Sequence, residues 1–547
     1  MKFFFLIVLF LCFSNALSQE KIVVRLINST YDQPEQILKL KKDRDLKKEI
    51  IARLHQKGFI NPKLNDSSIK NDTLLYNADL GRQFSYLQLK MPSDRSLEKD
   101  TVLLAIDQYP QYVDQLLDQL SEKGQVFSKI RIDQLTIKND STLQGNISIN
   151  KSKKRKISAI KLKGYNEFPV SYLKYYLGLK RSVVFDRKDI VKRSKGINEL
   201  VFARQVKEPQ VQFKKDSTLL YMYLEKQKSN QFEGFLGFTN DDRQELQLNG
   251  DIDLRLVNNF NYGESFDLQY KNNGSDQEQF RIGAELPYLF NTPFSLTAGL
   301  DLFRQDSTYS TTSQKVKVNY QISPRWRLKT GAQFKRSTSL QDEQSLVLDT
   351  SVVDLRSNRF MLGSSFFIPT DIKTALPIKN NIDLEANIGK RALLNTSDNT
   401  TDERQFSFSL DNQWFIPVNK RQFIYLGNFN RLLISDNYVT NELFRFGGMK
   451  NIRGFPENNF FADIYSVLQT EYRYVLGPDL FVHSVLDLSY FENQVQNINT
   501  DLYSLGLGIG LQTQGGLLRL ILANGNEGGR SITFDQTQFH IKFSSLF

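Results

Sequence analysis

The sequence predicts a membrane-spanning antiparallel β-barrel of sixteen strands, preceded by small α+β modules. Three observations predict this fold. From residue 231 to residue 547, apolar and polar residues alternate with a period of two, whereas residues 19–230 mix short strand patterns with amphipathic helices. The charge divides at the same point: residues 19–230 carry 41 Lys+Arg and 25 Asp+Glu, and residues 231–547 carry 29 and 35. Two parts with different surroundings are therefore expected.

The first eighteen residues have the pattern of a secretory signal peptide. Lys2 precedes an apolar stretch at residues 3–13, and Ala16-Leu17-Ser18 supplies small residues before Gln19. A retained N-terminal anchor is the alternative, but this stretch is short for a membrane-spanning helix. We expect cleavage after residue 18 and export of the chain, so nucleic acid is an improbable partner.

Cysteine and histidine are too sparse for a metal site. The single cysteine, Cys12, lies in the predicted signal peptide, so the mature chain would have neither disulfides nor thiolate ligands. His55, His483 and His540 lie in unrelated segments. We expect no metal and no cofactor.

The clearest N-terminal unit is residues 155–230. A short strand before Gly164 is followed by two helical stretches, 170–177 and 186–200, and then by strands near 206–213 and 219–224. This order resembles the polypeptide-transport-associated (POTRA) domain, a small periplasmic module. The resemblance implies that exposed strand edges could accept a strand of an unfolded client.

Weaker copies of the same pattern precede it. Residues 19–90 contain a strand at 21–27, a helix at 46–57 and a closing strand at 85–89. Residues 91–154 contain a helix at 112–123 and strands at 130–137 and 145–149. We predict three POTRA-like modules, with two modules and an irregular leader as the rival.

A basic run stands at the border of the second and third modules. Residues 151–156 read Lys-Ser-Lys-Lys-Arg-Lys. A solvated linker and a contact with anionic lipid head groups are both consistent with this run.

Residues 231–547 contain too many alternating strands for one soluble sandwich, in which every polar face would have to point at water. Ladders such as 246–256, 280–290 and 406–414 place apolar residues on one face and polar residues on the other. A closed barrel with lipid outside and a polar interior satisfies both faces and every backbone group.

Turn signals give the number of strands. Six short connections are expected at 258–263, 291–293, 323–324, 417–420, 477–479 and 513–516, with a longer one at 369–377. Longer polar stretches between them, such as 336–357, 391–403 and 524–532, are expected at the external end. This pattern gives sixteen strands, with the modules and the C-terminus on the periplasmic side.

The last strand is aromatic. Phe539, Ile541, Phe543 and Phe547 share one face, and the chain printed here ends on Phe547. A terminal aromatic strand resembles the outer-membrane targeting signal of bacterial barrels.

A glycine- and phenylalanine-rich segment falls in the sixth external loop, between residues 433 and 464. It contains the tetrapeptide Ile452, Arg453, Gly454 and Phe455. This segment resembles the sixth loop of the BamA/TamA-like insertase and transporter superfamily, which folds back into the barrel with a Val/Ile-Arg-Gly-Phe/Tyr tip. The resemblance implies an internal loop latch in this chain.

The same resemblance assigns two lumenal partners, Glu471 and Asp487. Parity agrees with it, because Glu471 shares a face with Gln469 and Arg473, and Asp487 lies between two leucines. Arg453 then has two carboxylate partners and can fork onto one or both. Carboxylates that merely line a wet lumen are the alternative. Residues 487–489 read Asp-Leu-Ser, where many members of that superfamily have Asp-x-Gly.

The resemblance implies an outer-membrane assembly or translocation factor. Its modules would receive unfolded outer-membrane or exported proteins, and the seam between residues 232–238 and 538–547 would open to insert them. Gly234 and Gly237 weaken the first of these strands, although glycine can also mark curvature. Lipids of the outer membrane and accessory periplasmic or lipoprotein subunits are further expected partners.

Two alternatives remain open. One is a secretion pore of the two-partner type, and the other is a diffusion channel with periplasmic domains. No Gly-x-Ser-x-Gly motif is present, and neither His483 nor His540 has a partner that sequence reveals, so we expect no enzymatic activity.

Overall fold

The computed structural model describes residues 21–28, 36–41, 46–70, 73–91, 101–240, 246–272, 277–341, 351–368, 380–394, 401–528 and 537–547. The predicted signal peptide, residues 1–18, and the predicted connection 369–377 lie outside this set. None of the helices in the described part of the chain has the length and apolar character needed to cross a bilayer.

Two four-stranded sheets lie in the N-terminal unit. The first has the order β2-β1-β4-β3. Its elements are β1 (Lys21–Asn28), β2 (Gln36–Lys41), α2 (Leu46–Gln56), β3 (Lys63–Lys70) and β4 (Thr73–Asp79). Helix α2 buries Ile50 and Leu54 in a cluster with Phe59 and Leu80, which is why this polar segment folds as a separate layer.

The second sheet has the order β6-β5-β8-β7. Its elements are β5 (Tyr86–Lys90), β6 (Thr101–Ala105), η1 (Ile106–Gln108), α3 (Tyr109–Glu122), β7 (Lys129–Ile137) and β8 (Thr142–Asn150). This arrangement corrects one prediction. The strand expected at 85–89 to close the first module pairs instead with β6 and β8. Its alternating Leu87 and Leu89 are buried with Leu116 of α3. The first sheet is completed by β3 and β4. The sequence pattern did not predict β3, because it contains the polar run Asn-Asp-Ser-Ser.

The third sheet, β10-β11-β9, belongs mainly to the same compact unit as the barrel. Its elements are β9 (Ala159–Gly164), η2 (Tyr172–Tyr176), α4 (Arg187–Ser194), η3 (Lys195–Glu199), β10 (Ala203–Phe213) and β11 (Thr218–Lys226). The first expected helix is a single π-helical turn, η2, and the second ends in the 3₁₀ turn η3.

Tyrosines of the third module contact the first two short turns of the barrel. Tyr172 donates to the Gly263 carbonyl (3.0 Å), and its ring packs edge-on against Tyr288 at 4.8 Å between centroids. Gly263 has φ +78°, and a Cβ there would lie 2.2 Å from the Tyr172 ring. Tyr165 is bonded to Asn258 (2.7 Å). We call Tyr165, Tyr172 and Tyr288 the tyrosine joint.

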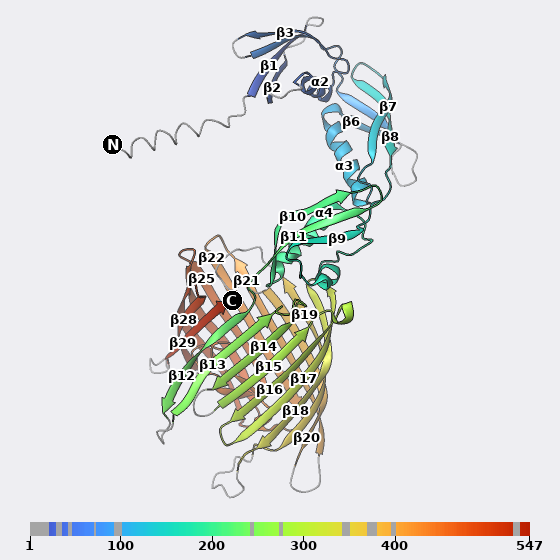
Figure 1. The fold of residues 1–547 in the computed structure, drawn as a ribbon. Helices are drawn as coiled ribbons and strands as arrows, with labels where there is room; N and C mark the ends of the chain where they lie inside the picture. The colour runs from blue at the N-terminus through green and yellow to red at the C-terminus, as the bar shows by residue number, and fades with distance from the viewer. Residues whose placement is uncertain are drawn as a thin grey trace, which may run out of the picture. The chain divides into compact units, whose positions relative to one another are not determined.

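Sixteen antiparallel strands form a closed barrel, as the sequence predicts. The ribbon in Figure 1 passes from green β12 to red β29 around this wall. The strands are β12 (Gln231–Asn240), β13 (Leu246–Val257), β14 (Ser265–Asn272), β15 (Gln277–Leu286), β16 (Phe294–Gln305), β17 (Tyr309–Ser323), β18 (Trp326–Ser339), β19 (Leu355–Ile368), β20 (Asn380–Leu393), β21 (Thr401–Pro417), β22 (Gln422–Ser435), β25 (Ile464–Val475), β26 (Leu480–Asn493), β27 (Ile498–Gln512), β28 (Leu517–Glu527) and β29 (Thr537–Leu546), with η4 (Leu289–Asn291) in one turn.

The two faces of the wall differ as the alternation predicts. Apolar side chains such as Leu507 (71% exposed) and Ile388 (62%) point outward. The inner face carries ion pairs between strands, including Arg327–Glu285 (2.7 Å) and Lys329–Asp383 (2.5 Å). An apolar outer belt around a charged interior is the arrangement of a barrel that faces lipid.

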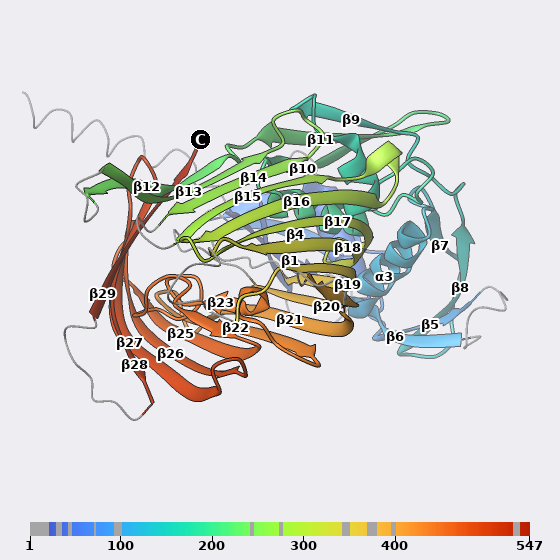
Figure 2. The ribbon, with the colours of Figure 1, turned by 90° about the horizontal axis from the view of Figure 1, so that it is seen from below.

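The ring closes between β12 and β29, the green and red strands at the left of Figure 2. Within the described residues, these strands pair only over Gln231–Glu233 and Ser544–Leu546. By contrast, β26 and β27 pair along their whole length. We call this short closure the seam.

Candidate functional site

The predicted sixth loop lies between the eleventh and twelfth barrel strands, β22 and β25, at residues 436–463. We call it loop six. It contains η5 (Thr440–Glu442) and a small hairpin of β23 (Phe444–Phe446) and β24 (Phe460–Ala462). Its aromatic residues form a core of their own: Phe446, Phe455 and Phe460 are buried with Phe491 of the barrel wall. The loop therefore packs against the inner wall as a folded element.

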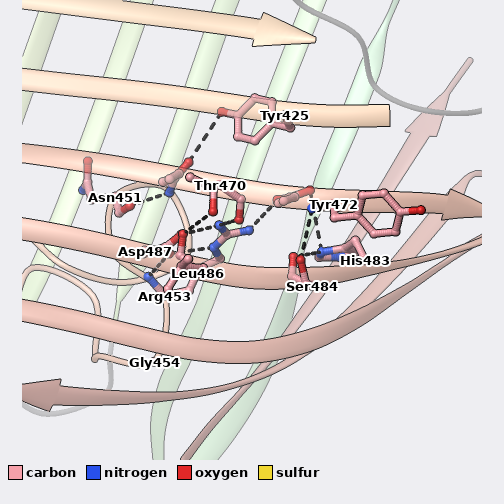
Figure 3. Close-up of polar contacts among 12 residues, drawn as sticks. Tyr425, Asn451, Arg453, Gly454, Thr470, Tyr472, His483, Ser484, Leu486 and Asp487 are labelled. Carbon is pink, nitrogen blue, oxygen red and sulfur yellow. Dashed lines mark hydrogen bonds and ion pairs between the residues drawn. The ribbon is translucent and has the colours of Figure 1, made fainter. Parts of the chain in front are cut away.

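Arg453 lies between the two carboxylates that parity assigns to the lumen, Glu471 and Asp487. Figure 3 shows its contact with Asp487. Its backbone N–H and its Nε donate to Asp487 Oδ2 at 3.0 and 2.8 Å. Nη2 reaches Asp487 Oδ1, and Nη1 reaches Glu471 Oε1. All three side chains are 3% exposed or less. The guanidinium thus forks onto Asp487 and bridges to Glu471.

The carboxylates keep Arg453 charged despite its burial. Burial by itself lowers the pKa of an arginine, but the hydrogen bonds and charge of Asp487, followed by those of Glu471, outweigh it and raise the pKa above its ordinary value. A permanently charged, buried group needs its partners, which makes the loop position dependent on them.

Glu471 has further basic neighbours, of which sequence reasoning placed Arg473 on its face and missed Arg519. Arg473 Nε donates to Glu471 Oε2 (2.5 Å), and Arg519 Nη2 lies 3.3 Å from Oε1. His483 Nδ1 is 3.6 Å from Oε2. Three guanidinium groups therefore share two carboxylates. Parity predicts Arg473 on the same face as Glu471, because it stands two residues later, whereas nothing local points to Arg519.

Sterics explain why the tetrapeptide has glycine at position 454 and phenylalanine at position 455. Gly454 has φ +81°, and a Cβ there would lie 2.6 Å from the backbone nitrogen of Gly525. The Phe455 ring covers Gly525 in turn, where a Cβ would lie 2.5 Å from that ring. Ile452 is fully buried in the loop core. The tip therefore fits against β28 at Gly525.

A second buried anchor holds the start of loop six. Arg391 of β20 is fully buried and pairs with Glu442 of η5 and with Glu403 of β21. Glu442 also accepts hydrogen bonds from Gln405 (2.7 Å) and from the backbone N–H of Val439 (3.2 Å). Sequence reasoning missed this anchor, because the partners belong to separate strands and carry no local motif.

The predicted targeting residues lie on or directly after β29. Phe539 and Ile541 point outward and are 59% and 50% exposed, and Phe543 follows with the same parity. Phe547 is 50% exposed, and its backbone N–H donates to the Asn230 carbonyl at 3.0 Å. The aromatic face thus belongs to the outer belt beside the seam.

Among known proteins, this chain resembles solved structures in fold. No family model matches the sequence, and no curated protein matches it. A crystal structure of BamA from Haemophilus ducreyi lacking POTRA domains 1–3 is similar at 14% identity, with 85% of this chain and all of that chain covered and a TM-score of 0.46.

Two structures of CdiB are also similar. CdiB from Escherichia coli matches at 13% identity and a TM-score of 0.54, with coverage of 84% of this chain and 90% of that chain. CdiB from Acinetobacter baumannii matches at 14% identity and a TM-score of 0.50, with coverage of 92% and 96%. The chain therefore shares its fold, from the α+β modules into the barrel, with CdiB.

Proposed function

We propose that this chain is a BamA/TamA-like assembly or translocation factor of the bacterial outer membrane. Its α+β modules act as POTRA domains in the periplasm and receive unfolded outer-membrane or exported proteins. The barrel or its seam then inserts or translocates them. The protein performs this task without a cofactor and without catalysing a covalent reaction.

One observation carries the proposal: loop six is folded back into the barrel and held there by Arg453 between Asp487 and Glu471. A simple diffusion channel gains nothing from a buried loop core and a desolvated ion cluster. Burying such charges is costly, so their presence favours a role in which the loop position matters.

The seam supports insertion into the membrane in particular. Its strands pair over three residues each, near one end. Opening the seam therefore breaks few backbone hydrogen bonds and exposes the edges of β12 and β29. Exposed backbone edges are templates for a further strand. A client strand could therefore pair with either edge.

A secretion pore is the second candidate. A cavity of about 840 Å³ in the lumen favours it, lined by Asp301, Lys315 and Glu385 among other charged residues. Such a lining would solvate an extended polypeptide. In this case the seam would stay closed and the client would pass through the lumen.

Depletion of the protein in its own cells separates these functions. Broad loss of outer-membrane barrels, measured by quantitative proteomics of the outer-membrane fraction, is expected for the assembly factor. Loss of one exported protein would favour the pore. Altered solute uptake with an unchanged membrane proteome would contradict both and favour a diffusion channel. Re-expression of the unaltered chain is the control.

A further inference from the structure

We propose that the tip of loop six, residues 450–458, clasps the seam from inside the barrel. It would hold β28 and β29 on one side and β13 and β14 on the other, so that the seam opens when the tip releases one side. This inference rests on the proposed function, because it describes how the seam used for insertion is kept shut.

The seam has few direct bonds, and they gather at one end. Besides the short register, Glu233 pairs with Lys542 (2.5 Å) and accepts a hydrogen bond from Ser544 (2.7 Å). The backbone N–H of Phe547 donates to Asn230 (3.0 Å). The described backbone register between β12 and β29 ends at Glu233 and Ser544. Contacts from the lumenal side can therefore add to the closure of the seam.

On the C-terminal side of the seam the tip is seated on β28 and β29. The backbone N–H of Gly454 donates to His540 Nε2 at 3.3 Å. Gly454 and Gly525 approach each other so closely that neither position has space for a Cβ. Because Arg453 is buried beside them with both carboxylates, this side is firmly fixed.

On the N-terminal side the tip reaches β13 and β14. Lys450 pairs with Asp253 (3.1 Å), and Glu457 pairs with Lys271 (3.2 Å). Lys271 also pairs with Asp251 (3.3 Å). The tip thus has ion pairs to the second and third strands, while its backbone is bonded to the last strand.

The registers place these ion pairs where the direct pairing stops. Asp253 is the partner of Glu233 on β12, which is the last β12 residue paired with β29. Asp251 is the partner of Phe235, beyond that point. The tip therefore attaches beside the unpaired length of the seam and spans it.

The two sides differ in strength. The Arg453 side is desolvated, and breaking a buried ion pair is costly. By contrast, Lys450 and Asp253 are 48% and 33% exposed, and Glu457 is 38% exposed, although its partner Lys271 is only 15% exposed. Exposed ion pairs contribute little and exchange readily with water. The geometry points to release on the β13–β14 side, with the tip staying on β28–β29.

Spin labels across the seam test the clasp. F232C and I541C place labels on outward side chains of β12 and β29, which are 39% and 50% exposed. The double variant K450Q/E457Q removes both ion pairs of the tip to β13 and β14. In this variant, pulsed dipolar spectroscopy in phospholipid nanodiscs should show the long-distance population of the labels grow roughly two- to five-fold. The matched control is E385Q, which removes the Lys317–Glu385 pair elsewhere in the lumen and should leave the distribution unchanged.

The fixed side has its own pair of variants. H540A removes the acceptor of the Gly454 N–H and should also increase the long-distance population, whereas H540Q keeps an acceptor and should restore the short distance. Heat-modifiable migration on gels confirms that each variant is folded. Unchanged distributions in both K450Q/E457Q and H540A would overturn the clasp.

The outcome is separable from the proposed function. An unchanged seam in the clasp variants would leave the depletion experiment and its assignment intact. Conversely, a depletion without loss of outer-membrane or exported proteins would contradict the proposed function, while the label distances would still report whether the tip closes the seam.

Discussion

At the scale of single residues, Arg453 carries the largest consequence. Its replacement by Ala leaves Asp487 buried without a guanidinium, while Glu471 keeps Arg473 and Arg519. We expect R453A to lose about 3–5 kcal/mol of unfolding free energy, the usual cost of breaking a buried ion pair. Urea unfolding followed by the fluorescence of the two tryptophans measures it.

R453K is the matched control. It keeps the charge but loses the planar fork that meets both oxygens of Asp487. We expect a stability between those of R453A and the parent, and the client insertion proposed above should follow the same order. An R453A protein with parental stability and activity would show that the ion cluster does not hold the loop.

Gly454 gives a second prediction at this scale. In G454A the methyl group would collide with the backbone of Gly525, and the positive φ would add about 1–2 kcal/mol of strain. G477A is the control, because its Cβ would meet nothing within 4 Å. We expect a lower urea midpoint for G454A only. Equal midpoints would mean that the tip can shift without cost.

At the scale of elements, the tyrosine joint ties η2 to the turns before β14 and β16. Y172A removes a ring packed against Tyr288 and the hydrogen bond to Gly263. Because burial of such a ring contributes a few kcal/mol, amide exchange in the turn at 258–263 should accelerate at least about tenfold. Hydrogen exchange with mass spectrometry measures this.

Y221A serves as its control. Tyr221 lies in the same module on β11, and its hydroxyl contacts Gln212 on the exposed face of the sheet. Its removal should leave exchange at 258–263 unchanged. Equal acceleration in both variants would point to general loosening of the module rather than to the joint.

Local pattern predicted most of the elements, and the failures have physical causes. Alternation identified the barrel strands because each strand has one lipid face and one lumenal face, and parity placed Glu471 and Asp487 on the lumenal face. It missed Arg391 with Glu442 and Arg519 with Glu471, because partners from distant strands leave no local pattern. The polar run in β3 likewise hid the strand that closes the first sheet.

The scale of the whole molecule concerns the two faces of the barrel wall. Leu507 lies on β27, 71% exposed on the apolar outer belt. L507R would place a charge among lipid chains and should cost about 2–4 kcal/mol near the bilayer midplane. Guanidinium unfolding in liposomes measures this loss.

S409R is the control for the opposite face. Ser409 lines the charged lumenal cavity, where water and carboxylates can accept a guanidinium. It should unfold at nearly the parental concentration. Similar losses in both variants would contradict the assignment of an outer lipid face and an inner wet face.

The tyrosine joint also has a mechanical consequence. Its contacts fall on turns at the feet of β13 through β16, which lie on the β12 side of the seam, and Tyr175 stacks on Tyr288 there as well. A pull on the third module would therefore act on these turns of the β12 side as a torque. The β25–β29 side, which holds the buried ion cluster, would stay fixed while the opposite side of the seam is rotated from the periplasmic end.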